Sequence, residues 1–427
     1  MRKTVRKQSA ADRSYLLPWI ICLLAALFYS YDFLLRVTPS VMIHPLMAEY
    51  SVNTTQIGLL SAFYYYAYTP LQLPSGLIVD KYNPRWVLSV SALCCTLGTF
   101  LFALTDYLVV AYVARAMMGI GSAFAFVGAL KLAALWLPEQ FALFSGITTA
   151  LGTLGAMATD TILSYMVAHA GWRNAVYYSA FAGLLLTLLL FLLVRDKPQS
   201  EKIITDDGYY HWSSLTYRLF CLFMNWRFCF TGLVGACLFL PISVFASLWG
   251  VAFIAERFDI STANAASMTS LIFLGMAVSG PLMGWLSDKI QNRSVFLFAG
   301  SFFVLLFSAL LIYKENIPFI WICPLLFLIG FSVGPQILTF AIAKEISPLG
   351  STGLATAATN FIVTIGAAIF QPLIGYFLEQ TWDGRLTTMG TPYYDVSNYR
   401  EAFTVFMIFL ALSFAMTFFI PKNTCKS

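Results

Sequence analysis

The chain has 427 residues, of which 59% are hydrophobic and only 11% charged, and its formal net charge is +5. A soluble domain carries roughly 25% charged residues, so this composition excludes a soluble globular fold. It also argues against a nucleic-acid surface, because the basic residues are scattered over short polar segments. The composition predicts an all-α protein embedded in a lipid bilayer.

Apolar runs of membrane-spanning length recur along the whole chain. A helix needs about 20 mostly apolar residues to cross the hydrocarbon core, because its backbone polar groups must be satisfied within the segment. The N-terminal part contains six such runs, near 16–43, 56–79, 86–104, 107–137, 141–168 and 174–194. Six more follow near 228–255, 264–287, 294–313, 317–343, 352–378 and 401–420. The sequence therefore predicts twelve transmembrane helices.

Lysine and arginine are unevenly distributed between the two sides of these spans. The side that carries both termini holds most of them, and cytoplasmic loops are the ones enriched in basic residues. We therefore expect cytoplasmic termini, in a bacterial inner membrane or, for a eukaryotic protein, a lysosomal or endosomal membrane. The basic N-terminal stretch precedes a span too long for a signal-peptide core and should remain in the mature protein.

A polar stretch after the sixth span divides the chain into two bundles. The expected organisation is a cytoplasmic tail, a six-helix bundle, a cytoplasmic linker, a second six-helix bundle and a second tail, at 1–15, 16–194, 195–227, 228–420 and 421–427. Within the linker, residues 213–227 mix apolar and basic side chains. They are either a helix on the cytoplasmic face or an early start of the seventh span.

An internal repeat relates the two bundles. One pattern of a glycine, an aspartate, a basic residue and an arginine follows the second span and returns 208 residues later after the eighth. The two copies are Gly76, Asp80, Lys81, Arg85 and Gly284, Asp288, Lys289, Arg293. Parallel repeats of this kind are typical of transporters built from two related bundles.

This doubled pattern resembles the signature loop of the major facilitator superfamily. Further similar pieces lie in spans four, six and eleven, so the resemblance extends over nearly the whole chain. It implies twelve transmembrane helices in two six-helix bundles with pseudo-two-fold symmetry, which rock about a central site lined by helices one, four, seven and ten. The loop aspartates can bind helix N-termini and pair with basic residues, so the eight repeat residues are expected to form a conformational latch.

Few charges lie inside the spans, and each needs an explanation because a buried charge costs about 2.5–3.5 kcal/mol on insertion scales. Counted from the span ends at about 1.5 Å per residue, four of these charges lie at a similar depth, on the outer side of the membrane centre. They are Asp32, Arg36, Arg115 and Asp160. Asp32 and Arg36 share a helix face. The charges considered are Asp32, Arg36, Arg115, Lys131 and Asp160.

Our hypothesis is that Arg36 and Arg115 attract an acidic substrate group, whereas Asp32 or Asp160 pairs with them in the empty site. Protonation of an aspartate would then couple transport to a proton gradient. In the alternative, Arg115 and Asp160 form a static pair and Arg36 reaches the interface. Lys131 either binds substrate from the inside or extends to the cytoplasm. The candidates from the second bundle are Trp249, Gln336, Asn360 and Gln371.

These features predict a secondary transporter of a small polar organic solute, such as an amino acid or organic anion, rather than an enzyme. Similarity to bacterial intraphagosomal amino-acid transporters and to the lysosomal dipeptide transporter branch leaves dipeptide uniport and siderophore or metabolite export as alternatives. A non-transporting membrane sensor on the same scaffold is an alternative of another class. We expect no cofactor, no metal and a functional monomer in the bilayer.

Overall fold

The computed structural model describes residues 2–195, 212–347, 352–387 and 390–420. Within these ranges the chain is helical and contains no β-strand, only an isolated bridge between Leu386 and Pro392. Residues 196–211 of the expected linker and the expected tail at 421–427 lie outside the described residues. The expected tail at 1–15 is continuous, from Arg2 on, with the first long helix.

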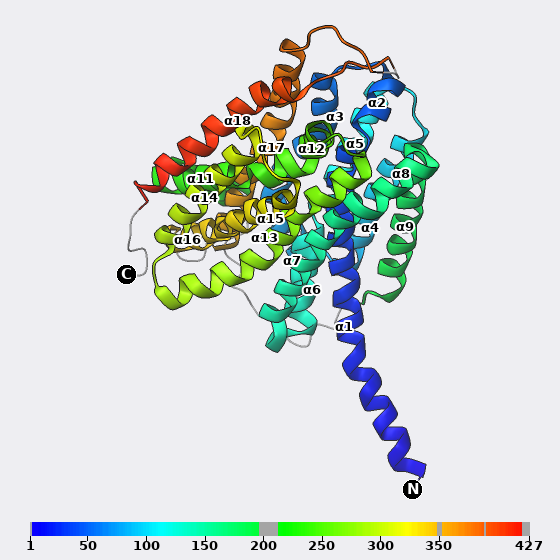
Figure 1. The fold of residues 1–427 in the computed structure, drawn as a ribbon. Helices are drawn as coiled ribbons and strands as arrows, with labels where there is room; N and C mark the ends of the chain where they lie inside the picture. Colours follow the sequence, from blue (N-terminus) through cyan, green and yellow to red (C-terminus); the bar gives the residue numbers. More distant parts are fainter. Residues whose placement is uncertain (1, 196–211, 348–351, 388–389, 421–427) are drawn as a thin grey trace.

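The N-terminal half is built from long helices, several of them divided into two or three consecutive segments, joined by short helical turns (Figure 1). In chain order they are α1 (Arg2–Val37), η1 (Thr38–Val41), α2 (Ile43–Tyr50), α3 (Thr54–Lys81), α4 (Pro84–Leu104), α5 (Leu108–Ser122), α6 (Ala125–Trp136), η2 (Pro138–Gln140), α7 (Phe141–Ala158), η3 (Thr159–Leu163), α8 (Ser164–Ala170) and α9 (Trp172–Leu193).

The C-terminal half repeats this plan after one additional helix. Its segments are α10 (Trp212–Met224), α11 (Trp226–Leu240), η4 (Pro241–Trp249), α12 (Gly250–Phe258), α13 (Thr262–Ile290), α14 (Arg293–Tyr313), η5 (Phe319–Trp321), α15 (Ile322–Val333), η6 (Gly334–Ile337), α16 (Leu338–Ile346), α17 (Thr352–Gln380) and α18 (Val396–Thr417). Asn225 caps α11, which makes α10 a separate helix and not an early part of the seventh span.

The helices are long and apolar enough for a multi-pass membrane protein. Ten segments of the described chain meet the length and hydropathy of a membrane span. The two other long segments, α3 and the α7–η3–α8 run, are not among these ten, and with them the count reaches the expected twelve.

Several spans change helix type along their length. Span five contains a π-helix, η3, and span seven contains another, η4, which begins at Pro241. Span ten contains the 3₁₀ segment η6, where Pro335 removes a backbone donor. π-helical segments inside α-helices are rare and are concentrated at functional sites. This makes η3 in span five and η4 in span seven candidate functional segments.

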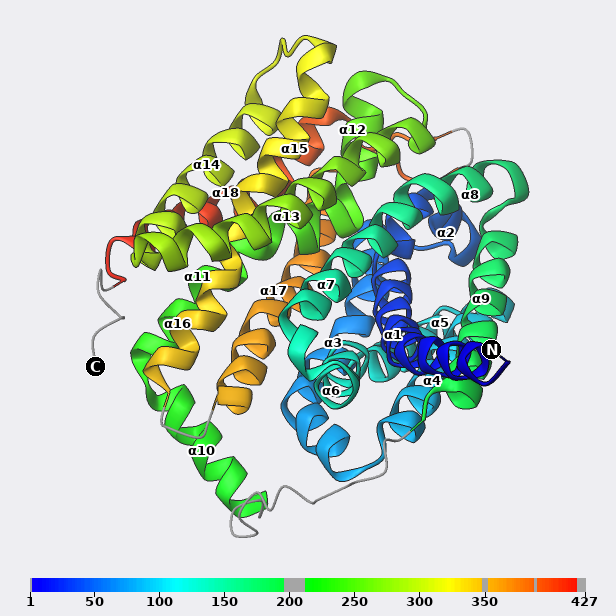
Figure 2. The ribbon, with the colours of Figure 1, turned by 90° about the horizontal axis from the view of Figure 1, so that it is seen from below.

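The two halves lie side by side and approach each other most closely at one end (Figures 1 and 2). We call this the distal end; it carries α2 and the loop before α18, whereas the proximal end carries the chain N-terminus, Asp80 and Asp288. Toward the proximal end the halves diverge in Figure 1. The main contacts between halves are α3 with α17, α7 with α13, and η1 with η4.

The seam between α3 and α17 is closed by small residues and a few hydrogen bonds. At its distal end the Thr54 hydroxyl donates to the Gly375 carbonyl at 2.9 Å and lies 3.2 Å from the Tyr394 hydroxyl. Farther along, the Asn360 amide donates to the side-chain oxygen of Gln72 at 2.8 Å. A Cβ on Gly58 would lie 2.6 Å from backbone atoms of Gln371. Glycine is therefore required there for the helices to touch.

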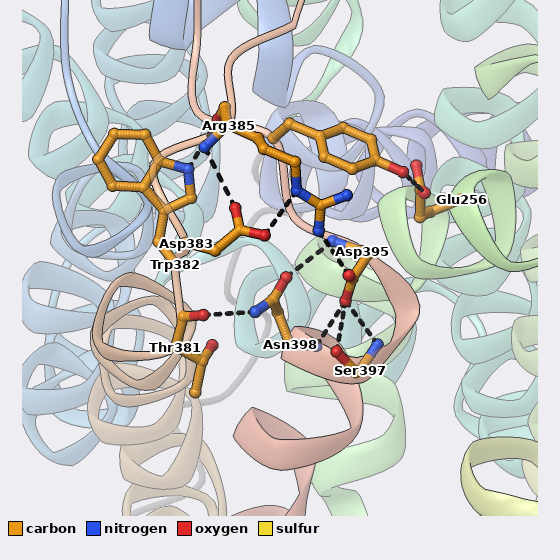
Figure 3. A network of polar contacts seen from close by, with 9 residues as sticks. Glu256, Thr381, Trp382, Asp383, Arg385, Asp395, Ser397 and Asn398 are labelled. Atoms are coloured by element: carbon orange, nitrogen blue, oxygen red, sulfur yellow. Dashed lines mark hydrogen bonds and ion pairs between the residues drawn. The ribbon is translucent and has the colours of Figure 1, made fainter.

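The loop before α18 is held by a compact polar network (Figure 3). Asp395 caps α18 by accepting from the backbone N–H groups of Ser397 and Asn398 at 2.9 and 3.2 Å. Arg385 pairs with Asp395 at 2.6 Å and with Asp383 at 2.5 Å. The hydrogen bond from the Ser397 hydroxyl and the contact with Arg385 lower the pKa of Asp395 to about 2. The loop is thus organised around an ionised aspartate.

We predict that Gly58→Ala opens the distal seam. Overpacking a tight contact costs about 1–3 kcal/mol, which moves a two-state equilibrium by roughly tenfold or more. Spin labels at positions 107 and 320, where Tyr107 and Ile320 are exposed at the distal end, should show a larger population at long distance. The matched control is Gly146→Ala, because a Cβ there would meet nothing within 4 Å. Equal distance distributions in both variants would contradict the prediction.

We also predict that this loop loosens in acid. A carboxylate whose pKa is lowered on folding stabilises the fold above its ordinary pKa of 3.8, and that contribution disappears as the pH falls toward about 2. Pepsin cleavage within residues 381–395, normalised to a reference peptide, should therefore rise between pH 4 and pH 2. Asp395→Asn should remove this pH step and Asp383→Asn should keep it. A step that survives Asp395→Asn would show another group to be responsible.

Candidate functional site

A buried ion pair lies near the distal end of α1. Arg36 Nη2 is 3.1 Å from Asp32 Oδ2, and the two residues are 5% and 0% exposed. They are one helical turn apart, so their side chains lie on the same face of α1. The Tyr64 hydroxyl, from α3, donates to the other Asp32 oxygen. The carboxylate is thereby neutralised by one cation and bound by one hydroxyl.

Aromatic rings surround the Arg36 guanidinium. Its Cζ is 4.4 Å from the ring centroid of Phe33 and 4.8 Å from that of Tyr68. The rings of Tyr64 and Tyr65 follow at 5.6 and 5.9 Å. Faces of aromatic rings attract cations, and the attraction is stronger away from water. The α3 tyrosines thus hold Arg36 in a low-dielectric environment without adding negative charge to the site.

Arg115 is a second buried cation, and it has no carboxylate partner among the described residues. Its Nη1 donates to the Leu35 carbonyl at 2.7 Å and its Nη2 to the Arg36 carbonyl at 3.4 Å, while its Nε has no partner. The residue is only 1% exposed. Since Asp32 and Arg36 cancel each other, Arg115 leaves the cluster with a net positive charge, compensated only by carbonyl dipoles and the Tyr64 ring.

Asp160 does not join this cluster by an ion pair. It lies in the π-helix η3 and is 0% exposed. The Ser40 hydroxyl donates to its Oδ1 at 3.4 Å, and its Oδ2 has no partner. The static pair between Arg115 and Asp160, which the sequence left open, is not present in this structure. Among the described residues, no cation pairs with this buried carboxyl.

Lys131, on α6, does not join the cluster around Arg36. Its Nζ is 2.6 Å from Asp80 Oδ1, at the proximal end of the N-terminal half. Both side chains are partly exposed there. The structure therefore places this candidate, on α6, in contact with the repeat aspartate Asp80 and not beside Arg36. The sequence indicated how deep Lys131 lies in its span but not which neighbour its side chain faces. In the structure that neighbour is Asp80.

The repeat residues make contacts within their own half. In the first copy Arg85 Nε donates to the Phe191 carbonyl at 2.8 Å and does not pair with Asp80, which binds Lys131. In the second copy Arg293 pairs with Asp288 at 3.6 Å and with Glu345 at 2.8 Å.

The remaining repeat residues are held less closely. The two lysines lie over neighbouring rings, Lys81 on Tyr82 and Lys289 on Trp285, and the two glycines, Gly76 and Gly284, have open space where a Cβ would lie. Each loop aspartate thus pairs with a basic residue, Asp80 with Lys131 and Asp288 with Arg293, and the described contacts of both copies do not join the halves.

The C-terminal half contributes neutral polar groups. Trp249 Nε1 donates to the Gln371 carbonyl at 3.0 Å, and the Gln371 side-chain Nε2 donates to the Ser243 carbonyl at 2.7 Å. Both hydrogen bonds connect η4 with α17. Asn360 lies at the seam, and Gln336 is buried in η6 with its carbonyl accepting from Thr339. Of these candidates, Trp249 and Gln371 are directly connected.

Some residues of this site were not foreseen in their roles. The tyrosine run in span two was visible, but only the structure shows that Tyr64 binds Asp32. The spacing of Tyr64 and Tyr68 is the signal that could have indicated it, because residues four apart share a helix face. Ser40 and Ser243 carry no such signal, since serines are frequent in spans and their partners come from distant helices.

Comparison with known proteins gives a consistent result. The family model described as Major Facilitator Superfamily matches residues 19–370 and 231–425. A protein of Cupriavidus necator described as a probable sulfoacetate transporter is 28% identical over 299 residues, 67% of this chain and 68% of that protein. A probable hexose phosphate transport protein of Chlamydia pneumoniae is 23% identical and covers 89% of both chains.

The fold is also found among solved structures. A bacterial homologue of the human lysosomal transporter Spinster, in an inward-facing and occupied conformation, superposes with a TM-score of 0.73. The superposition covers 96% of each chain at 16% sequence identity. At this identity the likeness concerns the fold alone.

Proposed function

This chain belongs to the major facilitator superfamily, and from that premise we propose that it transports small organic anions bound by Arg36 and Arg115. It is a transporter of small organic solutes and not an enzyme, and it resides in a lipid bilayer. The proposal concerns the class of solute, the coupling and the orientation.

The observation that carries the proposal is the buried cation without a carboxylate. Burying a charge is costly unless it is paired, and Arg115 has only carbonyl oxygens and a tyrosine ring as compensation. A carboxylate, sulfonate or phosphate group would supply the missing negative charge. Guanidinium groups bind such oxyanions with two parallel hydrogen bonds, and the Nε of both arginines is free to donate.

The relatives favour the same solute class. The sulfoacetate and hexose phosphate named in their descriptions are both organic anions, although they differ in size and in hydroxyl content. Organic anions are a narrower class than the solutes considered from the sequence. The class excludes amino acids and dipeptides, because these carry a cationic group that would repel Arg115.

The ion pair of α1 supplies a mechanism of release and rebinding. In the empty site Asp32 occupies Arg36. An arriving anion competes with Asp32 for that guanidinium and supplies the negative charge that Arg115 lacks, so the loaded cluster of Arg36, Arg115, Asp32 and the anion is neutral overall. The loaded protein loses the pair of Asp32 with Arg36 and gains the pair of the anion with Arg36. This exchange keeps the free energies of the loaded and empty proteins close.

Asp160 is our candidate for the coupling proton. A charged carboxylate buried without a counter-ion costs several kcal/mol, and Asp160 has only the Ser40 hydroxyl beside it. We infer that it is neutral in this closed-seam conformation and releases its proton when η3 becomes hydrated. Asp32, which holds Arg36, would then bind and release substrate without itself exchanging the proton.

The orientation follows from the distribution of basic residues. We propose that the proximal end is cytoplasmic, as the positive-inside rule favours, and that the membrane is a bacterial inner membrane, the compartment that the two bacterial relatives favour. The closed distal seam then corresponds to an inward-facing conformation. One chain contains the whole site, so we expect a functional monomer driven by a proton gradient.

We predict that Arg115→Gln weakens the binding of organic anions roughly tenfold to a hundredfold, because a hydrogen bond to a charged group contributes about 1.5–3 kcal/mol. Thermal stabilisation of the purified protein by sulfoacetate and glucose 6-phosphate measures this, since a ligand of the native state stabilises it. Arg227→Gln, at the start of α11 and outside the site, is the matched control. Stabilisation by anions that is equal in all three proteins would exclude Arg115 from the site.

For the coupling we predict that Asp160→Asn keeps solute exchange across proteoliposome membranes and loses accumulation driven by a pH gradient. An asparagine resembles the protonated carboxyl, so binding and rocking continue while the proton is no longer carried. Asp32→Asn should instead impair exchange itself, because it leaves Arg36 without its resting partner. Gradient-driven accumulation by Asp160→Asn would remove this aspartate from the coupling.

A further inference from the structure

Four buried polar atoms lack hydrogen-bond partners along the contact between α3, η4 and α17. They are Ser61 Oγ, Tyr65 Oη, Ser243 Oγ and Gln371 Oε1. Most buried polar groups in proteins are hydrogen-bonded, and each exception requires an explanation. These four come from three elements of both halves, so they are not the result of one badly packed helix.

The Gln371 amide is held in one orientation. Its Nε2 donates to the Ser243 carbonyl at 2.7 Å, and its own backbone carbonyl accepts from Trp249 at 3.0 Å. Since the donor end of the amide is occupied, Oε1 is left as an acceptor. The residue is 0% exposed and contacts α3 where Gly58 allows it. An acceptor fixed in this way has the properties of a recognition group.

These atoms continue from the charged cluster. Tyr65 belongs to both, because its ring is 5.9 Å from Arg36 Cζ while its hydroxyl is free. Gly58, which touches Gln371, lies seven residues before Tyr65 on the same helix, or about 10 Å along the axis. The Ser243 segment η4 packs against both α1 and η1. The separation is comparable to the length of an extended hexonate.

We propose that Ser243, Gln371 and Tyr65 form a hydroxyl-binding subsite, so that the preferred solute is a polyhydroxylated organic anion. This proposal rests on the anion site of the preceding subsection. The anionic group binds at Arg36 and Arg115, and the hydroxyl groups extend along α3 toward Gln371. Ser61 lies on the same face of α3, one turn from Tyr65, and lines the path between them.

The chemistry of the free atoms fits hydroxyl groups. Gln371 Oε1 accepts only, whereas the Ser243 and Tyr65 hydroxyls both donate and accept, and a polyol offers groups of both kinds along its chain. An aliphatic anion of equal length would leave all of these atoms unpaired in a dry site. Sites built for hydrogen bonding reject analogues that lack the matching groups far more strongly than apolar pockets reject an extra group.

The subsite is closed in this structure because α3 and α17 are in contact across it. The partners of the unpaired atoms can enter only when the seam opens toward the site. Closure around a hydroxylated solute would then restore hydrogen bonds that closure on an empty site leaves unmade. Recognition and closure of the seam thus depend on the same side chains.

The test compares two pairs of probes with equal charge and similar length. Gluconate is matched with hexanoate, and glucose 6-phosphate with hexyl phosphate, and affinities for the detergent-purified full chain are measured by calorimetry. We expect the wild-type protein to bind each hydroxylated probe at least about a hundredfold more tightly. Ser243→Ala and Gln371→Leu should each reduce that ratio by roughly tenfold while the affinity for the aliphatic probes stays unchanged.

Thr364→Val is the control variant, because Thr364 lies on the same seam and bonds to Thr69 at 3.1 Å. It should keep the wild-type ratio. Equal wild-type affinities for hydroxylated and aliphatic probes would overturn this inference and leave the anion site intact. A ratio that survives both Ser243→Ala and Gln371→Leu would also overturn it. Failure of all four anions to bind would overturn both this inference and the proposed function.

Discussion

The cost of placing charge away from water governs the interior of this protein. Asp32 and Arg36 can be buried because each neutralises the other, and the α3 tyrosines surround the pair without changing its charge. Arg115 is buried beside them without a carboxylate partner among the described residues, and its guanidinium donates to the Leu35 and Arg36 carbonyls. The position of α3 follows from this arrangement, because Tyr64 and Tyr68 must reach Asp32 and Arg36 on α1 while Gly58 and Thr54 contact α17.

The same constraint explains why the two halves differ. The N-terminal half holds the buried charges, whereas the C-terminal half presents neutral amide, indole and hydroxyl groups at the corresponding contact. A second set of buried charges facing the first would have to be desolvated each time the halves approach. Neutral polar groups lose less on desolvation, and this lets η4 and α17 close against α3.

Much of this could be predicted from the sequence, because hydropathy and charge act locally. The lengths of the spans, the doubled loop and the burial of Asp32, Arg36, Arg115 and Asp160 all follow from residue type and position. Partners could not be predicted in the same way. Lys131 binds Asp80 because α3 and α6 end near each other. Asp160 does not pair with Arg115, because the position of η3 keeps the two side chains apart. Helix rotation and tilt decide such pairings, and a single sequence does not encode them in a readable pattern.

The π-helical segments were also beyond sequence reasoning. Neither η3 nor η4 has a composition that distinguishes it from an α-helix, apart from Pro241 at the start of η4. Both contain a residue with a partner on another element, Asp160 bound by Ser40 and Ser243 bound by Gln371. Such contacts belong to tertiary packing, from which most helical stability in proteins comes.

The seam of α3 and α17 is nearly free of interlocking side chains, since glycines and backbone atoms meet where Gly58 and Gly375 lie. At these two glycines the contact is formed by backbone atoms rather than by interdigitated side chains. The two helices can therefore separate at these glycines without side chains leaving grooves in the other helix. Few polar contacts, such as those of Thr54 and Asn360, must break. The strength of those contacts is therefore the natural target for tuning how readily the seam opens.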